Sequence, residues 1–484
     1  MINTKLISNI IGKLLILEAI IMATSFVMAL AYQEVDSLTF LLSSLITIVA
    51  GIIFQILGRE SKNTLNRKDA FLVVTLVWIV FSVFGMLPYQ ISGYIKNPTD
   101  AFFETMSGFT TTGCTILDDV EILPHGMLFW RSTTQFIGGL GIVFFTIALL
   151  PSLVGGTVRV FSAESTGPMN TKLHPRLSTS AKWILTIYIL LTVACMISFG
   201  LAGMSWFDAV CYSMSTTATG GFSTHNESVS FFHNDTIEYV AVIFLFLSGI
   251  NFTLLYMTLF KLKIKELMKN SEFKMYLIIV LVSTAFITIE LITQSGYDVK
   301  GALRAALFQV ISFITTTGLF SDDVARWPHI TWLILGLLMF VGASSGSTAG
   351  GIKCMRAVMT LKIVMNEFRR KLHPKAVLPV RINGQNIGYQ SMPTLIAFLA
   401  LYMMLLIITT TVMILIGIDN TNAISIALSC LSNVGPSLST NIGEPMSWAD
   451  LPATVKWFCS ALMLMGRLEI FTVLVIFTPE FWKD

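Results

Sequence analysis

The sequence predicts an all-α integral membrane protein, and three observations lead to this fold class. The 484-residue chain is 54% hydrophobic and only 12% charged, whereas soluble proteins carry about 25% charged residues. Apolar stretches of about 20 residues, enough for a helix to cross a bilayer, recur along its length. Short Ser/Thr/Gly runs lie between some of them in a common frame. We expect ten transmembrane helices: four tandem span–re-entrant loop–span repeats around a pseudo-fourfold pore, plus an N-terminal helix pair.

Ten apolar segments are long enough to cross the bilayer, and their even number places both termini on one side. The first is longer than the apolar part of a secretory signal and has no convincing cleavage site, so we expect no cleaved leader. The predicted spans are 7–32, 37–57, 70–93, 127–150, 181–203, 236–260, 273–296, 330–362, 390–418 and 451–478.

The distribution of Lys and Arg predicts the orientation. Most of the 31 Lys and Arg residues, but few of the 28 acidic ones, lie in alternate connections. These segments are 1–13, 58–69, 151–182, 261–274, 353–389 and 479–484. Because cytoplasmic loops are enriched in Lys and Arg, both termini are predicted to be cytoplasmic. The acidic outer loops would attract cations, although the same bias also follows from the topology rule alone.

A fourfold internal repeat is visible in three aligned residue types. An alanine stands twelve residues, and a serine six residues, before each of four glycines: Gly113, Gly221, Gly318 and Gly435. Such agreement in four places indicates an internal repeat. The corresponding units are an N-terminal hairpin at 1–57 and pore repeats at 58–150, 151–260, 261–368 and 369–484.

Each repeat contains one apolar piece that is too short to cross. These pieces lie at 99–109, 205–216, 299–314 and 420–432, and each ends at a Ser/Thr/Gly run. We expect half-helices whose C-terminal ends, each with about half a negative charge, point at a common cavity and favour a cation there. Two spans per unit give all repeats one orientation, unlike the inverted repeats of many transporters. Four such loops would form a ring of carbonyls of the kind that replaces the hydration shell of potassium.

The loop sequences resemble a known family. They read TTTGC, ATGGF, TTTGL and SNVGP, and they are accompanied by GGLGIVFF at 138–145 and TGGFSTH at 219–225. With the glycine-rich segment at 342–351, these motifs resemble the Trk/Ktr/HKT superfamily of bacterial potassium transporters over nearly the whole chain. The extra helix pair at 1–57 resembles its TrkH branch rather than the shorter KtrB branch.

The resemblance implies a potassium-binding selectivity filter in these loops. Its residues would be Thr111, Thr112, Gly113, Thr219, Gly220, Gly221, Thr316, Thr317, Gly318, Asn433, Val434 and Gly435. No loop carries the TVGYG of tetrameric potassium channels, and Asn433-Val434 replaces Thr-Thr, so weaker rejection of sodium is expected. The alternative is that these small residues are helix-packing surfaces.

A gate is expected below the filter. The segment GASSGSTAGG at 342–351 interrupts a long span, and each Gly disfavours helix by about 1 kcal/mol relative to Ala. The resemblance makes it a mobile intramembrane loop, formed by Gly342, Ser344, Ser345, Gly346, Ser347, Thr348, Gly350 and Gly351. The alternative is a close helix crossing through small residues.

Two arginines lie in or near spans. The position of Arg467 corresponds to the pore arginine of the family, which implies an electrostatic barrier to cations; the alternative is an ion pair with Glu469 or Glu290. Arg131 lies near a span end and is expected to snorkel towards water.

Partners follow from the resemblance alone. It implies a homodimer in the bacterial inner membrane that binds a cytosolic nucleotide-binding RCK-type subunit (TrkA), for which the basic stretches 261–274 and 369–381 are docking candidates. The chain has no G-x-G-x-x-G or P-loop of its own, so nucleotide control would come from that partner. Beyond potassium and membrane lipid, we expect no organic cofactor and no nucleic acid. The six Cys are expected to be free buried thiols.

The predicted function is potassium uptake through a gated, channel-like pore, without enzymatic chemistry. One alternative is a proton- or sodium-coupled secondary transporter, which a pair of carboxylates within the membrane would favour; Glu18, Glu290 and Glu469 lie in or near spans, but none lies in a filter loop. An integral-membrane enzyme would need a catalytic or metal constellation that the sequence does not show. A sodium- or ammonium-preferring channel on the same scaffold is a further alternative.

Overall fold

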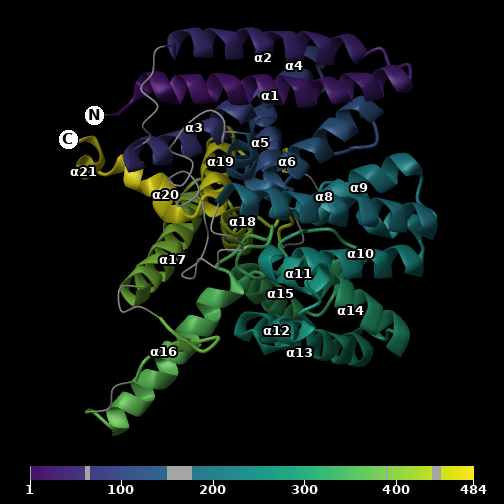
Figure 1. Cartoon of the computed structure of the whole chain (residues 1–484). Coiled ribbons are helices and arrows are strands. Elements are labelled where there is room, and N and C mark those ends of the chain that lie inside the picture. Colours follow the sequence, from purple (N-terminus) through teal and green to yellow (C-terminus); the bar gives the residue numbers. More distant parts are fainter. Residues whose placement is uncertain are drawn as a thin grey trace.

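The computed structural model is built almost entirely from helices (Figure 1). It describes residues 2–59, 66–149, 177–375, 378–387, 391–438 and 448–483. Most of the predicted cytoplasmic segment 151–182 lies outside these residues.

The N-terminal pair forms a tight helical hairpin along one edge of the molecule (Figure 1). It consists of α1 (Thr4–Ala31) and α2 (Ser37–Leu57), where the first two spans were predicted. The helices approach closely at Gly12 and Gly51, since a Cβ at Gly12 would lie 2.5 Å from the carbonyl oxygen of Gly51. Small residues permit this separation in the absence of a hydrophobic force between helices in lipid.

The helices that follow, some of them short, begin within or next to the other predicted spans, although the last helix of the predicted span 330–362 extends beyond it to Leu372. They are α3 (Arg67–Gly85), α4 (Leu87–Ser92), α6 (His125–Leu149), α8 (Leu177–Ala202), α10 (Asp235–Ser248), α11 (Phe252–Leu259), α13 (Ser271–Ser295), α15 (His329–Val341), α16 (Cys354–Leu372), α17 (Ser391–Leu415), α19 (Ala453–Arg467) and α20 (Ile470–Leu474). Among the described residues, six helices are long and apolar enough to span a membrane, or eight if two bent pairs each count as one span. A mostly helical membrane protein is therefore confirmed, in this coarse form.

The bends have local causes. The chain turns by 106° between α10 and α11, where Asn251 caps α11, and by 115° beyond Arg467, where Glu469 has a positive φ of 58°. The α15 helix has only 13 residues because the glycine-rich segment ends it at Val341. Neither bend was predicted, whereas the break at residue 342 was.

Four short helices carry the site, and each begins at a side-chain cap. They are α5 (Pro98–Phe109), α9 (Trp206–Ala218), α14 (Val299–Ile314) and α18 (Asn420–Ser432). The capping side chains accept hydrogen bonds from first-turn N–H groups, which helix starts otherwise leave unpaired; they are Asn97, Ser205, Asp298 and Asp419. These helices match the four predicted half-helices.

The remaining elements are short. They are η2 (Ser228–Phe232), α12 (Ile264–Lys269), η3 (Val324–Arg326), β1 (Arg381–Ile382), β2 (Gln385–Asn386), η4 (Val475–Phe477) and α21 (Pro479–Trp482). The all-α prediction missed the antiparallel β1–β2 hairpin. Its turn is Asn383-Gly384, and both residues have positive φ, as the favoured two-residue hairpin turn requires.

The two ends of the chain meet at the start of α3. The N–H of Asn3 donates to Asp69 at 2.9 Å, and the Lys68 ammonium donates to the carbonyl oxygen of Lys483. Both termini therefore lie at the same end of the helical body, as the even number of predicted spans requires.

Candidate functional site

The four Ser/Thr/Gly loops share one backbone conformation. We call them loops 1 to 4; they are residues 110–114, 218–222, 315–319 and 432–436. In each, a residue with a φ of 52–56° is followed two positions later by a glycine with a φ of 78–102°. In each, the backbone N–H between those two residues donates to the carbonyl oxygen of the aligned serine at 2.8–3.0 Å. Non-glycine residues are uncommon at positive φ, so four aligned examples mark a common local structure.

The loops form a closed ring. A Cβ added to any of the four aligned glycines would lie closer than 3.0 Å to a carbonyl oxygen of the next loop. The contacts follow chain order and return to the start: Gly113 meets Gly220, Gly221 meets Thr317, Gly318 meets Val434, and Gly435 meets Thr112. Glycine is needed here both for its φ and for this close backbone approach.

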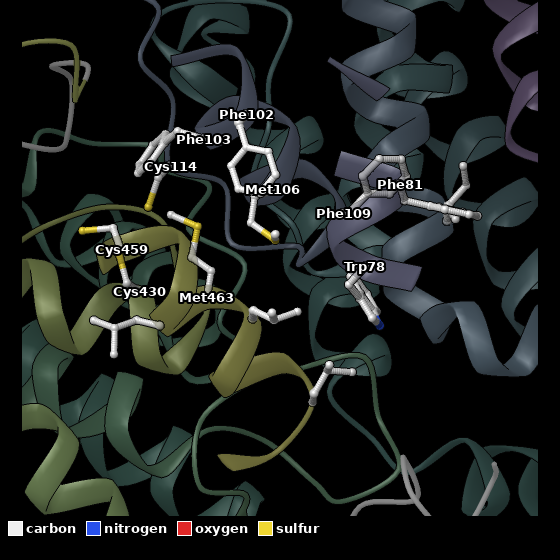
Figure 2. Close-up of a cluster of buried hydrophobic side chains, with 14 of the residues drawn as sticks. Trp78, Phe81, Phe102, Phe103, Met106, Phe109, Cys114, Cys430, Cys459 and Met463 are labelled. Carbon is white, nitrogen blue, oxygen red and sulfur yellow. The ribbon is translucent and has the colours of Figure 1, made fainter. Parts of the chain in front are cut away.

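Side chains of the loops themselves link loop 1 to loop 4. Asn433 donates to the Thr112 hydroxyl at 2.9 Å and to the carbonyl oxygen of Met463 at 2.8 Å, so the replacement of Thr by Asn in loop 4 adds a cross-link. The thiol of Cys114 donates to the carbonyl oxygen of Gly435. Figure 2 shows Cys114 in the same buried cluster as Cys430, Cys459 and Met463. All six cysteines are free and buried, as predicted.

A buried ion pair links the residues that directly follow loops 1 and 2. Arg131 on α6 is 1% exposed and binds the carboxylate of Glu104 on α5, which is fully buried, at 3.0 Å. The guanidinium also donates to the Thr115 hydroxyl at 3.2 Å and to the carbonyl oxygen of Ser223 at 3.1 Å. The prediction that Arg131 snorkels towards water is therefore wrong. Its partner lies on another helix, and no spacing rule within one helix would have paired them.

The interrupted span passes directly against the ring. We call residues 342–353 the intramembrane break. Its Thr348 hydroxyl donates to the carbonyl oxygen of Thr217 at 3.1 Å, and the N–H of Gly350 donates to the Thr316 hydroxyl at 2.6 Å. The N–H of Gly351 donates to the carbonyl oxygen of Ser432. The break thus contacts residues in or next to loops 2, 3 and 4.

Two side chains hold the other edge of the break. Glu272 in the first turn of α13 accepts from the N–H groups of Ser345 at 2.5 Å and Met355 at 3.1 Å. Asn251, at the bend between α10 and α11, donates to the carbonyl oxygen of Ser345 at 2.5 Å. Both N–H groups donate to the same carboxylate oxygen, so Glu272 connects Ser345 to the start of α16.

Arg467 bridges three elements. It ends α19, and its guanidinium donates to the carbonyl oxygens of Thr348 in the break at 2.8 Å and of Gly138 and Gly139 in α6 at 2.5 and 3.0 Å. The alternative partner Glu469 binds Arg356 instead, at 2.5 Å. Arg467 therefore holds the break against α6 and places a positive charge beside it.

A histidine lies just beyond loop 2. The two ring nitrogens of His225 lie 3.4 Å from Glu121 and 3.5 Å from Asp208, and its ring stacks on Phe231. Burial lowers the pKa of His225, but the two carboxylates raise it more, so the pKa lies above its ordinary value of 6.5.

This arrangement predicts a pH-dependent contribution to stability. Because the folded pKa exceeds the unfolded one, protonated His225 stabilises the fold fully below pH 6.5, and this contribution is lost as the pH rises through the folded value. The Tm of the wild type should exceed that of His225→Gln at about pH 5.5 and approach it at about pH 9. The exposed His233 provides the control: His233→Gln should show no such convergence. A Tm difference independent of pH would contradict the prediction.

These features define a class of membrane protein in which four short helices end at loops that close into one ring, with an interrupted helix packed against it. Residues 37–484 match the TrkH family of cation transport proteins, and the chain belongs to this family. The resemblance inferred from the loop motifs is therefore confirmed.

Individual relatives match over the full length. The chain is 35% identical to the Trk system potassium uptake protein TrkH of Halomonas elongata, over 99% of this chain and 100% of that protein. It is 34% identical to TrkH of Escherichia coli K12, over 99% of each. The crystal structure of the potassium transporter TrkH from Vibrio parahaemolyticus matches with a TM-score of 0.89 and 33% identity, covering 99% of each chain. These relatives are named as transport proteins, which are transporters rather than enzymes.

Proposed function

We propose that this chain takes up potassium through a pore lined by the ring of four loops. The closed ring carries the argument, because it gathers four re-entrant backbone segments at the ends of four short helices. Each helix C-terminus contributes about half a negative charge and favours a cation. Relatives over the whole chain are named as potassium uptake proteins. In this proposal the four units are pseudo-symmetric repeats with the boundaries given above.

The filter would consist of three residues in each loop: the aligned threonine or asparagine, the residue after it and the glycine that follows. Backbone carbonyls in such a ring replace the hydration shell of potassium. The ring is asymmetric, since the side-chain amide of Asn433 donates hydrogen bonds to Thr112 and Met463 and the other loops have threonine at this position. This asymmetry supports a filter with fewer equivalent sites than that of a tetrameric channel, and therefore with a weaker preference for potassium over sodium.

The gate would be the intramembrane break together with Arg467. Contacts of the break with loops 2, 3 and 4, and its attachment through Thr348 to Arg467, support a closed position directly under the ring. Opening requires these hydrogen bonds to be exchanged for others. A cytosolic RCK-type subunit would supply the free energy for this exchange. It would act on a homodimer in the bacterial inner membrane, with both termini of the chain in the cytoplasm.

A coupled transporter is the second candidate, and one observation favours it. Glu18 in α1 is fully buried, and neither of its carboxylate oxygens has a hydrogen-bond partner among the described residues. Proton carriers within membranes are ionisable groups of this kind. Glu18 packs near Gly85 in α3, behind loop 1 rather than in the ring.

Cation flux into proteoliposomes that hold this chain alone tests the proposal. We expect uptake of potassium and rubidium in preference to sodium, and no uptake by empty liposomes. Measuring internal pH in the same vesicles separates the two candidates, because only the coupled transporter would move protons in proportion to potassium. Absence of cation flux, both alone and after addition of the regulatory subunit, would contradict the pore.

A further inference from the structure

We propose that Glu104 and Arg131 are positioning residues that set the selectivity of the filter. The inference rests on the proposed pore and concerns what holds its ring in shape. Neither residue belongs to a loop. Both are buried, and together they reach the outer ends of two adjacent loops.

Arg131 binds equivalent positions directly after loops 1 and 2. Arg131 donates to the side chain of Thr115 and to the backbone of Ser223, which lie two residues beyond the filter glycines of loops 1 and 2. The guanidinium also lies over the ring of Phe222, 4.1 Å from its centroid. A planar fork with fixed donor directions sets the separation of the groups that it bridges. Arg131 therefore fixes the distance between the ends of loops 1 and 2.

Glu104 completes the arrangement from the loop 1 side. Its carboxylate accepts from the Arg131 guanidinium, from the Thr115 hydroxyl at 3.0 Å and from the N–H of Ile116 at 3.0 Å. It thus orients Arg131 and neutralises a charge that would otherwise lie buried beside a cation pathway. An uncompensated buried charge is strongly unfavourable, so each residue needs the other.

The pair occurs in one repeat only. At the positions aligned with Glu104, nine residues before each filter glycine, the other repeats have Tyr212, Gln309 and Ile426. None of these side chains carries a charge near neutral pH, so a buried ion pair at this position is not a general requirement of the repeat. It therefore marks the junction of loops 1 and 2 as different from the other three junctions.

The test compares relative flux of potassium and sodium in matched variants. Glu104→Gln keeps the shape of the side chain but leaves the charge of Arg131 without a counter-charge. The double variant Glu104→Gln/Arg131→Met removes both charges and keeps similar side-chain volumes. Removing both partners of a buried pair largely restores stability. We expect the double variant to recover the wild-type Tm. Its potassium preference should nevertheless fall about tenfold, which corresponds to about 1.4 kcal/mol between the two cations.

A second, partly buried ion pair on α5 provides the control. Lys456 binds Asp100 at 2.7 Å, at the far end of the same helix from loop 1. The double variant Asp100→Asn/Lys456→Met should keep the wild-type preference. Arg131→Lys, which retains the charge but loses the fork, should lie between the wild type and the double variant.

The outcomes separate this inference from the proposed function. A selective wild type and an equally selective Glu104→Gln/Arg131→Met would overturn the positioning role, as would an equal loss in the Asp100/Lys456 control. A wild type that conducts cations without preferring potassium would contradict the proposed filter itself. If the double variant does not fold, the Arg131→Lys variant tests the inference instead. Full retention of potassium selectivity in Arg131→Lys would overturn it.

Discussion

Gly113→Ser is expected to abolish the preference for potassium over sodium. Its φ of +86° is a conformation that residues with a Cβ rarely adopt, and holding serine there would cost about 1–2 kcal/mol. The new Cβ would also lie closer than 3.0 Å to the carbonyl oxygen of Gly220. Loop 1 or loop 2 must therefore move, and the ring cannot keep its spacing. Relative uptake of potassium, rubidium and sodium into proteoliposomes measures the effect.

Gly93 separates backbone strain from this steric effect. Its φ is +82°, close to that of Gly113, but an added Cβ would meet nothing within 4 Å. Gly93→Ser should therefore lose a similar increment of stability and keep the wild-type preference for potassium. Equal selectivity in Gly113→Ser and the wild type would show that selectivity does not reside in the ring.

Arg467→Ala is expected to raise cation flux by about tenfold or more. The substitution removes a positive charge beside the intramembrane break. Such a charge repels a passing cation, by about 4 kcal/mol at a separation of about 4 Å in a partly hydrated environment. The substitution also removes the bond to Thr348 that holds the intramembrane break against α6. Both effects act in the same direction. Initial uptake rates without the regulatory subunit would measure them together.

Arg467→Lys distinguishes the two effects. Lysine keeps the charge but lacks the planar fork that reaches Thr348, Gly138 and Gly139. If electrostatic repulsion dominates, this variant should conduct as slowly as the wild type. If the hold on the break dominates, it should resemble Arg467→Ala. Unchanged flux in both variants would remove Arg467 from the gate.

Local features of this fold were predictable because they depend on hydropathy and backbone preference. The four short helices and the break at residue 342 follow from apolar length, capping residues and glycine content. The bends at Asn251 and Glu469 were missed because each lies inside a long apolar segment whose composition alone is compatible with a straight helix. The β1–β2 hairpin was missed although Asn383-Gly384 is a favourable turn, since the strands have only two residues each.

Contacts between distant segments were not predictable from one sequence. The aligned motifs indicated that the loops are equivalent, but their order around the ring comes from the structure alone. The same holds for Arg131, whose partner Glu104 lies on another helix, and for Glu272, which is contacted by a segment beyond the next two helices. Conversely, Arg467 was singled out because an arginine in an apolar span needs a special environment.

The closure of the ring within a single chain has a genetic consequence. Loop 4 completes the circle by returning to Thr112 of loop 1, so one translated chain supplies every member of its ring. A cell that carries both a normal and a defective allele would therefore build intact rings and defective rings side by side, and never mixed ones. Each quarter is also encoded by its own stretch of the gene, so a residue such as Asn433 can become established in one position without being copied into the other three.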